Sequence, residues 1–329
     1  MTRTERRSHS RAIEVNSPMS RPRSRTRSPL LVGEKMIQRL KRLGMALSML
    51  GAATMAVVGG SSGLAGAAVS RGPGHPTQAE LIPLYDNANA ANWTAVCSQT
   101  NGSGGGSWII ADPAAGQGPG TAPVPAWAKV IDNCYNYGRA SVIGYVWTDY
   151  GEGGQASIAG IESQIKAWYS FYKGDIAGIF FDGVSDTVPG TTTSNQSFYR
   201  TLANYVHTHE GNNDEVVFNF GANPGSAWML DSSNANNADI VVTFEGSYDT
   251  AGENPYTSWA PAAWEAAYPA KDFSALIYNA PGEDTAPQPA SACSSLAQQN
   301  IGYVYVGTWY DLLPPYFSSF LADAAQGTC

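Results

Sequence analysis

The sequence lacks the short motifs that mark nucleotide, metalloprotease and serine-hydrolase sites. It contains no GxxxxGK[ST] loop, no GxGxxG that opens a helix after a strand, no HExxH and no GxSxG. Gly116–Gly120 (GQGPG) is rich in glycine, but Pro119 removes an amide donor that a phosphate-binding loop would need. We therefore expect no cofactor.

Metal ligands of the zinc type are also scarce. The chain has four cysteines, none of them in a CxxC pair, and His207 and His209 lie two positions apart on a predicted helix, where they point to different sides. We therefore expect no metal site and take both histidines as exposed helix positions. An even number of cysteines in an exported chain instead predicts two disulfides, for which three connectivities are open.

Basic residues are few outside the first part of the chain. Residues 1–67 hold 12 of the 19 Lys and Arg and 3 of the 27 Asp and Glu, so residues 68–329 carry 7 basic and 24 acidic residues, a net charge of −17. Such a domain repels nucleic acid and anionic membranes and attracts a cationic polymer, although solubility alone also accounts for the charge.

One apolar run, Leu43–Val58, follows Lys35, Arg39, Lys41 and Arg42 and precedes small residues, as in a secretory signal peptide. A membrane anchor is the alternative, but Gly and Ser dilute the apolar run after residue 58. We predict a disordered basic leader at 1–35, a signal peptide at 36–67, a short linker at 68–79 and one domain at 80–329. The mature protein is expected outside the cell, free of the membrane and monomeric.

The domain contains eight short apolar runs, each followed by a stretch that reads as a helix. Most are continuous rather than alternating, which is typical of parallel strands covered on both faces. Eight such units over about 250 residues predict a single (β/α)8 TIM barrel. The runs are Leu81–Asp86, Ser107–Pro113, Ser141–Trp147, Ile176–Asp182, Glu215–Gly221, Ile240–Glu245, Phe273–Asn279 and Gly302–Thr308.

The predicted helices between the runs suggest how the cysteines pair. Cys97 and Cys134 fall on the first two helices, and Cys293 and Cys329 fall on or after the last two. Consecutive helices are neighbours in the outer ring of a barrel, so we favour Cys97–Cys134 and Cys293–Cys329. The predicted helices are Ala126–Tyr137, Ile158–Tyr172, Asn195–His207, Ser258–Tyr268, Ala292–Gln299 and Pro314–Ala325.

The active site of a barrel lies at the carboxyl ends of its strands, and here those ends carry carboxylates, amides and aromatic rings. Paired carboxylates perform acid/base or nucleophilic chemistry, and aromatic rings stack on sugars, so the set indicates glycoside hydrolysis. The candidate substrate-binding residues are Tyr85, Asp112, Tyr145, Trp147, Tyr150, Asn219, Asn279, Trp309 and Tyr310. Asp86 and Asp112 are as readily explained as helix caps or loop braces.

Asp182 and Glu245 are the candidate catalytic residues. Each directly follows a buried apolar run, GIFF and VVTF respectively, where a charge needs partners or a raised pKa. We expect Asp182 to act as nucleophile and Glu245 as general acid/base, the order of the two roles being the weaker inference. Asp149, Glu152 and Asp186 lie in loops and are expected to be solvated.

The ordered set of motifs resembles the spherulation-specific family 4 (spherulin-4-like) proteins. It comprises LIPLY near the start of the domain, the D-P…GPG pattern at Asp112–Gly120, VIGYVWTDYG at Val142–Gly151, GIFFD at Gly178–Asp182, VVFNFGANP at Val216–Pro224 and VVTFE at Val241–Glu245.

The resemblance implies a (β/α)8 glycoside hydrolase that cuts α-1,4-linked polymers containing galactosamine or N-acetylgalactosamine, such as galactosaminogalactan. It places the essential carboxylates at Asp182 and Glu245. The chain departs from the family pattern at Gly183, where a Glu often follows the Asp, and at Asp112, where the pattern has Asn; Asp186 is the candidate to replace the missing Glu.

Three hypotheses follow. The first is a secreted, retaining glycosidase acting on an amino-sugar polymer. The second is a catalytically silent carbohydrate-binding protein, which Gly183 favours and the retention of both carboxylates opposes. The third is a stress or spore-coat protein without a ligand, which leaves the aromatic residues at the strand ends unexplained.

Overall fold

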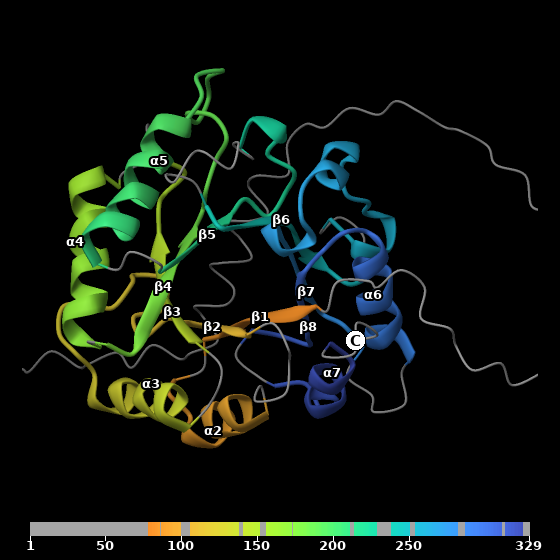
Figure 1. The fold of residues 1–329 in the computed structure, drawn as a ribbon, viewed down its shortest axis with the longest axis horizontal. Helices are drawn as coiled ribbons and strands as arrows, with labels where there is room; N and C mark the ends of the chain where they lie inside the picture. Colours follow the sequence, from red (N-terminus) through yellow and green to blue (C-terminus); the bar gives the residue numbers. More distant parts are fainter. Residues whose placement is uncertain are drawn as a thin grey trace, which may run out of the picture. The chain divides into compact units, whose positions relative to one another are not determined.

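A computed structural model gives the fold, and it describes residues 78–85, 87–99, 106–137, 141–151, 156–172, 174–210, 214–228, 238–250, 254–281, 287–310 and 313–324. Eight parallel strands close into a barrel in chain order, with β1 pairing to both β2 and β8 (Figure 1). The strands are β1 Ala79–Leu84, β2 Trp108–Ala111, β3 Ser141–Trp147, β4 Ile176–Asp182, β5 Glu215–Asn219, β6 Ile240–Ser247, β7 Phe273–Tyr278 and β8 Tyr303–Val306. The predicted (β/α)8 barrel is confirmed.

Helices cover the outside of the barrel, as Figure 1 shows for α3, α4 and α5 beside the first strands. The α-helices are α2 Ala90–Gln99, α3 Pro125–Tyr137, α4 Ile158–Phe171, α5 Gln196–Tyr205, α6 Pro287–Gln298 and α7 Phe317–Ala324. A π-helical turn, η2 Val206–Glu210, continues α5. In α4 the apolar spacing places Ile161, Ile165 and Trp168 against the barrel, and the Ser157 side chain caps the first turn.

The connection from β6 to β7 differs from the prediction. Instead of one helix over 258–268 it contains three short 3-10 helices: η4 Tyr256–Ser258, η5 Ala263–Ala267 and η6 Ala270–Asp272. Pro261 lies inside the predicted helix and Pro269 follows it; proline removes a backbone donor and disfavours helical conformation in the residue before it. After β5, the described residues contain one further short turn, η3 Ser226–Trp228.

One disulfide is confirmed. Cys97 in α2 bonds to Cys134 in α3, with the two Cα atoms 5.0 Å apart, and the rings of Trp93 and Trp127 pack edge-to-face beside it. Cys293 is also disulfide-bonded, but Cys329 lies outside the described residues, so its pairing with Cys293 stays a prediction. Over the described part of the chain, no helix is both long and apolar enough to cross a membrane.

The barrel wall has an irregular position in β6 that sets the direction of Glu245. Between β6 and β7 the register slips at Val242/Phe244, so that Thr243 is an extra residue. Thr243 bonds to Glu265 of η5, and Phe244 packs on Tyr256 and Trp259 of the same connection. Two consecutive side chains therefore face the outer layer, and Glu245 turns back to the inside of the barrel.

Candidate active site

Three consecutive strands end in the groups that form the centre of the site. Asp182 closes β4, Asn219 closes β5, and Glu245 lies near the end of β6. Parallel strands bring their carboxyl ends to one rim, and the slip in β6 turns Glu245 toward this rim. We call this end of the barrel the mouth.

Asn219 bridges the two carboxyl groups. Its Nδ2 donates to Asp182 Oδ1 at 2.8 Å and to Glu245 Oε2 at 2.6 Å. Its Oδ1 accepts the backbone N–H of Gly221 at 3.0 Å, which fixes the orientation of the amide. The two carboxylate oxygens can be no farther apart than the sum of the two bonds from Asn219, so the pair is closely spaced.

Asp182 receives a second side-chain hydrogen bond. The hydroxyl of Tyr145, from β3, donates to Oδ2 at 2.6 Å, so both oxygens of the carboxylate are occupied. Its own backbone is held as well, because the Thr148 hydroxyl donates to the Asp182 carbonyl at 2.9 Å and also pairs with Tyr199. Asp182 is 8 % exposed and therefore rigidly placed.

Tyrosine rings enclose the pair. Tyr85 after β1 packs edge-to-face on Tyr145 at 5.8 Å and on Tyr310 after β8 at 5.9 Å. Tyr310 also contacts Tyr278, which ends β7. Burial, followed by the nearby Asp182 and Glu245, holds the pKa of the Tyr85 hydroxyl well above its usual range, so the phenol stays protonated and can donate.

Asp182 and Glu245 differ in the groups that shift their pKa values. Burial raises the pKa of Glu245 to about 7, and the charge of Asp182 adds to this, against the opposing effect of Asn219 and Tyr310. Burial also raises the pKa of Asp182, but three hydrogen bonds, from Tyr145, the Gly183 backbone and Asn219, stabilise its ionised form. Asp182 is thus the carboxylate whose ionised form is stabilised by more hydrogen-bond donors, and Glu245 is the group suited to carry a proton near neutral pH.

Asp112 is a third buried carboxyl group at the mouth. It directly follows β2, is 8 % exposed, and accepts the Gly116 backbone N–H at 2.6 Å through Oδ2. Burial raises its pKa to about 7, with a further contribution from the charge of Asp182. Its Oδ1 is buried and accepts no hydrogen bond from the described residues. One oxygen thus braces the loop, as the alternative interpretation expected.

Trp147 and Tyr150 form a separate aromatic pair next to Asp182. Their rings meet edge-to-face at 5.3 Å. Gly183 has a φ of 64°, and a Cβ atom placed on it would lie 2.6 Å from the Trp147 ring. A Glu at position 183 would therefore collide with the indole. The observed position of the Trp147 ring thus requires glycine at position 183.

The remaining predicted residues do not join the hydrogen bonds that hold the carboxylate pair, or they lie outside the described residues. Trp309 contacts the Tyr278 ring at 5.9 Å, and among the described residues it has no hydrogen bond to Asp182 or Glu245. Asn279 is exposed, with a φ of 52°, and Asp186 is exposed in its loop, so neither is brought to the carboxylate pair. Asp149 is half-buried rather than solvated, while Asp86 and Glu152 lie outside the described residues.

Tyr278, Thr148 and Tyr199 are not among the site residues predicted from the sequence. Tyr278 could have been found, because it ends an apolar run just as Asp182 does. Thr148 and Tyr199 act through the Asp182 backbone, which no strand-end pattern reveals. The described residues contain no group of three or more His, Cys, Asp or Glu placed to hold a metal ion.

Comparison with known proteins agrees with this fold. A crystal structure of Aspergillus clavatus Sph3 in complex with GalNAc is similar with a TM-score of 0.61 at 20 % identity, over 76 % of this chain and 98 % of that chain. A family GH18 chitinase from Chromobacterium violaceum matches with a TM-score of 0.42 at 10 % identity, over 75 % of this chain and 83 % of that chain. Comparison with curated proteins gives no match.

The family of the chain is identified by a match of its sequence to a family model. The model of the spherulation-specific family 4 matches residues 80–324, which span the whole barrel from β1 to the end of α7. The chain belongs to the spherulation-specific family 4.

Proposed function

We propose that the protein is a secreted glycoside hydrolase that cleaves an α-1,4-linked polysaccharide containing galactosamine or N-acetylgalactosamine. The observation that carries this proposal is the bridge from Asn219 to Asp182 and Glu245. The two hydrogen bonds measure 2.8 Å and 2.6 Å, so Asp182 Oδ1 and Glu245 Oε2 can be at most 5.4 Å (2.8 + 2.6) apart. This limit fits the carboxyl spacing of about 5–5.5 Å in retaining enzymes and lies below the spacing of about 6.5–9.5 Å in inverting enzymes.

Asp182 acts as the nucleophile. Its carboxylate attacks the anomeric carbon, the glycosidic C–O bond breaks, and a glycosyl ester forms on Asp182. The hydrogen bonds from Tyr145 and Asn219 hold the attacking group in one orientation. They also favour its ionised form, which is the form that attacks.

Glu245 acts as general acid and then as general base. Its carboxylic acid gives a proton to the departing glycosidic oxygen, and the resulting carboxylate later takes a proton from the water that hydrolyses the ester. A pKa of about 7 suits both steps, because the group holds its proton at mildly acidic pH and releases it readily.

The substrate class rests on the charge and lining of the mouth. In their ionised forms Asp112, Asp182 and Glu245 attract a cationic amino sugar, and the tyrosine rings offer faces for pyranose stacking. The N-acetylgalactosamine bound in the similar Sph3 structure supports a galactosamine-type sugar. Export is supported by the Cys97–Cys134 disulfide, which is typical of an oxidising compartment.

The experiment is incubation of the purified protein with partially deacetylated galactosaminogalactan, with other polysaccharides in parallel. We expect release of short galactosamine-containing oligosaccharides, whose masses report the sugar and the cleavage mode. Binding of the polymer without any product would replace this proposal by a non-catalytic carbohydrate-binding protein, which the absence of a carboxylate at Gly183 favours.

A further inference from the structure

A second, uncharged cavity lies on the outer wall of the barrel. It has a volume of about 300 Å³ and lies between the η4 segment and α6. Its lining consists of Tyr256, Thr257, Trp259, Ser291, Ala292, Ser295 and Gln299. None of these side chains is charged, in contrast to the three carboxyl groups of the mouth.

This outer pocket is on the opposite side of strand β6 from the proposed catalytic acid. Phe244 packs on the Trp259 ring at 4.8 Å and on the Tyr256 ring at 6.1 Å, so it supports the aromatic wall of the pocket from below. The next residue, Glu245, faces Asn219 inside the barrel. The pocket and the mouth are therefore separate sites that share one strand.

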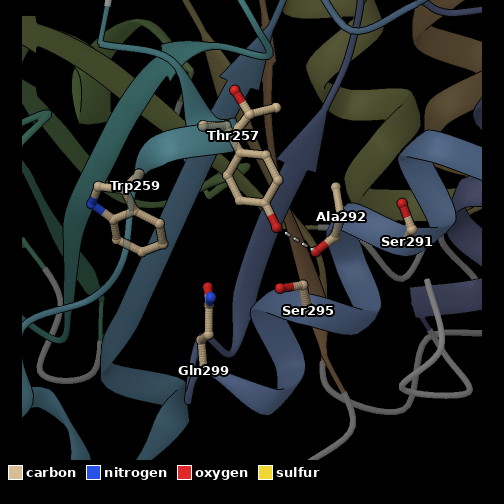
Figure 2. A pocket seen from close by; sticks show the side chains of 7 residues that line it. Thr257, Trp259, Ser291, Ala292, Ser295 and Gln299 are labelled. Atoms are coloured by element: carbon tan, nitrogen blue, oxygen red, sulfur yellow. Dashed lines mark hydrogen bonds between the residues drawn. The ribbon is translucent and has the colours of Figure 1, made fainter. Parts of the chain in front are cut away.

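The polar groups of the outer pocket converge on one space. Figure 2 shows the Trp259 ring on one side, with the Gln299 amide and the Ser295 hydroxyl directed into the same space from α6 and its end. The Tyr256 hydroxyl donates to the Ala292 carbonyl at 3.1 Å, which fixes the tyrosine ring as a rigid part of the wall.

Gln299 provides the observation that points to a ligand. Its Oε1 is buried, and none of the described residues donates a hydrogen bond to it. A buried polar oxygen without a donor costs free energy, which a hydroxyl or amide N–H group of a bound molecule would recover. Among the lining groups it is therefore the one most in need of an external partner.

We infer that the outer pocket binds one neutral pyranose residue, with a sugar face on Trp259 and hydroxyl or N-acetyl groups on Gln299 and Ser295. An aromatic platform beside a few fixed polar groups is the composition expected of a small-molecule site, and the volume is at the low end for such sites. The absence of charged lining groups selects an N-acetylated sugar over a free amino sugar.

The inference also assigns the pocket a role in substrate binding. That the bound sugar belongs to the polymer cut at the mouth rests on the proposed function. A chain that contacts both sites is held by two weak interactions, which raises its overall affinity without any change in chemistry. The outer pocket would then hold acetylated stretches, while the mouth prefers units with free amines.

The test is an NMR titration of the whole protein with N-acetylgalactosamine and, separately, with galactosamine. The indole N–H signal of Trp259 is assigned by its loss in Trp259→Phe. We expect this signal to shift with N-acetylgalactosamine and, much less, with galactosamine, and Gln299→Ala to weaken the binding about tenfold. Gln298→Ala is the control, since Gln298 is exposed on the same turn of α6.

Equal titrations in Gln299→Ala and Gln298→Ala, or no shift of the Trp259 signal, would overturn the pocket as a sugar site. This readout needs no hydrolysis, so it stands if the proposed function fails. In kinetics, Gln299→Ala should raise KM for the long polymer severalfold and leave an aryl glycoside too short to reach both sites unaffected. An unchanged KM for the polymer would remove the role in substrate binding.

Discussion

The two ends of the barrel both bury polar groups, but they connect them differently. At the end opposite the mouth, which we call the floor, the Glu80 carboxylate accepts the Ser107 hydroxyl, and Gln78 Nε2 donates to the Ile301 carbonyl at 3.0 Å. Each bond joins β1 to the start of a neighbouring strand. At the mouth, Asp182 and Glu245 face one another through a single donor, Asn219.

The floor groups therefore serve stability, and the mouth groups serve the chemistry. The two floor hydrogen bonds cross strand boundaries and so help to close the barrel. The mouth places two acids close enough that each raises the cost of ionising the other, an arrangement that destabilises the fold when both groups are ionised. Substitutions at the mouth should therefore cost activity, and substitutions at the floor should cost stability.

The largest expected effect is on Glu245. Glu245→Gln removes the proton donor and should lower polymer hydrolysis by about 10²–10⁴-fold. An aryl glycoside with an acidic leaving group needs less proton transfer, so its cleavage to the glycosyl intermediate should be affected much less. Initial burst rates on the two substrates provide the measurement, and equal losses on both would contradict the assignment of Glu245 as the acid.

A smaller loss is expected from Tyr145→Phe, which removes one hydrogen bond from Asp182. Hydrogen bonds to charged groups contribute about 1.5–3 kcal/mol, so kcat/KM should fall by about 10–100-fold. The pKa of Asp182 should also rise, because the ionised form loses a donor, and the acidic limb of the pH–rate profile should move to higher pH. A rate loss without that movement would point to general disruption.

At the floor, Ser107→Ala removes the donor to Glu80. We expect the free energy of unfolding to decrease by about 1–3 kcal/mol, with kcat on the polymer unchanged. Urea unfolding and initial rates measure the two quantities, and Ser98→Ala, at an exposed position of α2, serves as the control. A loss of activity with unchanged stability would reverse the contrast between the two ends.

The smallest effect concerns stability and pH. The pKa values of Glu245 and Asp112 are raised to about 7 in the folded protein, so between about pH 4 and 7 the folded state binds more protons than the unfolded state. Ionisation of these two groups therefore destabilises the fold, and the effect is complete above about pH 7. The free energy of unfolding should decrease between pH 5 and 8 by about 1–3 kcal/mol more in the wild type than in an Asp112→Asn, Glu245→Gln variant. Parallel pH dependences in the two proteins would contradict the raised pKa values.

The barrel could be predicted from the sequence, because eight apolar runs bounded by turn residues report strands directly. The runs Ser141–Trp147 and Ile176–Asp182 match β3 and β4 residue for residue. The helix predicted over 258–268 was wrong. The prediction followed the apolar spacing of this segment and ignored Pro261, whose restricted backbone favours short 3-10 turns over one continuous helix.

The candidate site could be predicted in part. Strand ends identified Asp182, Asn219 and Glu245, but strict alternation along β6 would place Glu245 on the same side as Thr243, which faces the outer layer. The extra residue at Thr243 reverses this, and no sequence pattern announces it. The outer pocket depends on contacts between η4 and α6, such as that of Tyr256 with Ala292, 36 positions apart, and could not be foreseen from local sequence.

The most direct test of the account is the rate of polymer hydrolysis by Asp182→Asn, measured beside wild type at the same concentration, with circular dichroism and polymer binding to verify the fold. The amide keeps the shape of the carboxyl group but cannot attack the anomeric carbon. The account predicts loss of hydrolysis with folding and polymer binding largely retained. Cleavage by this variant at near wild-type rate would contradict the proposed chemistry of the mouth.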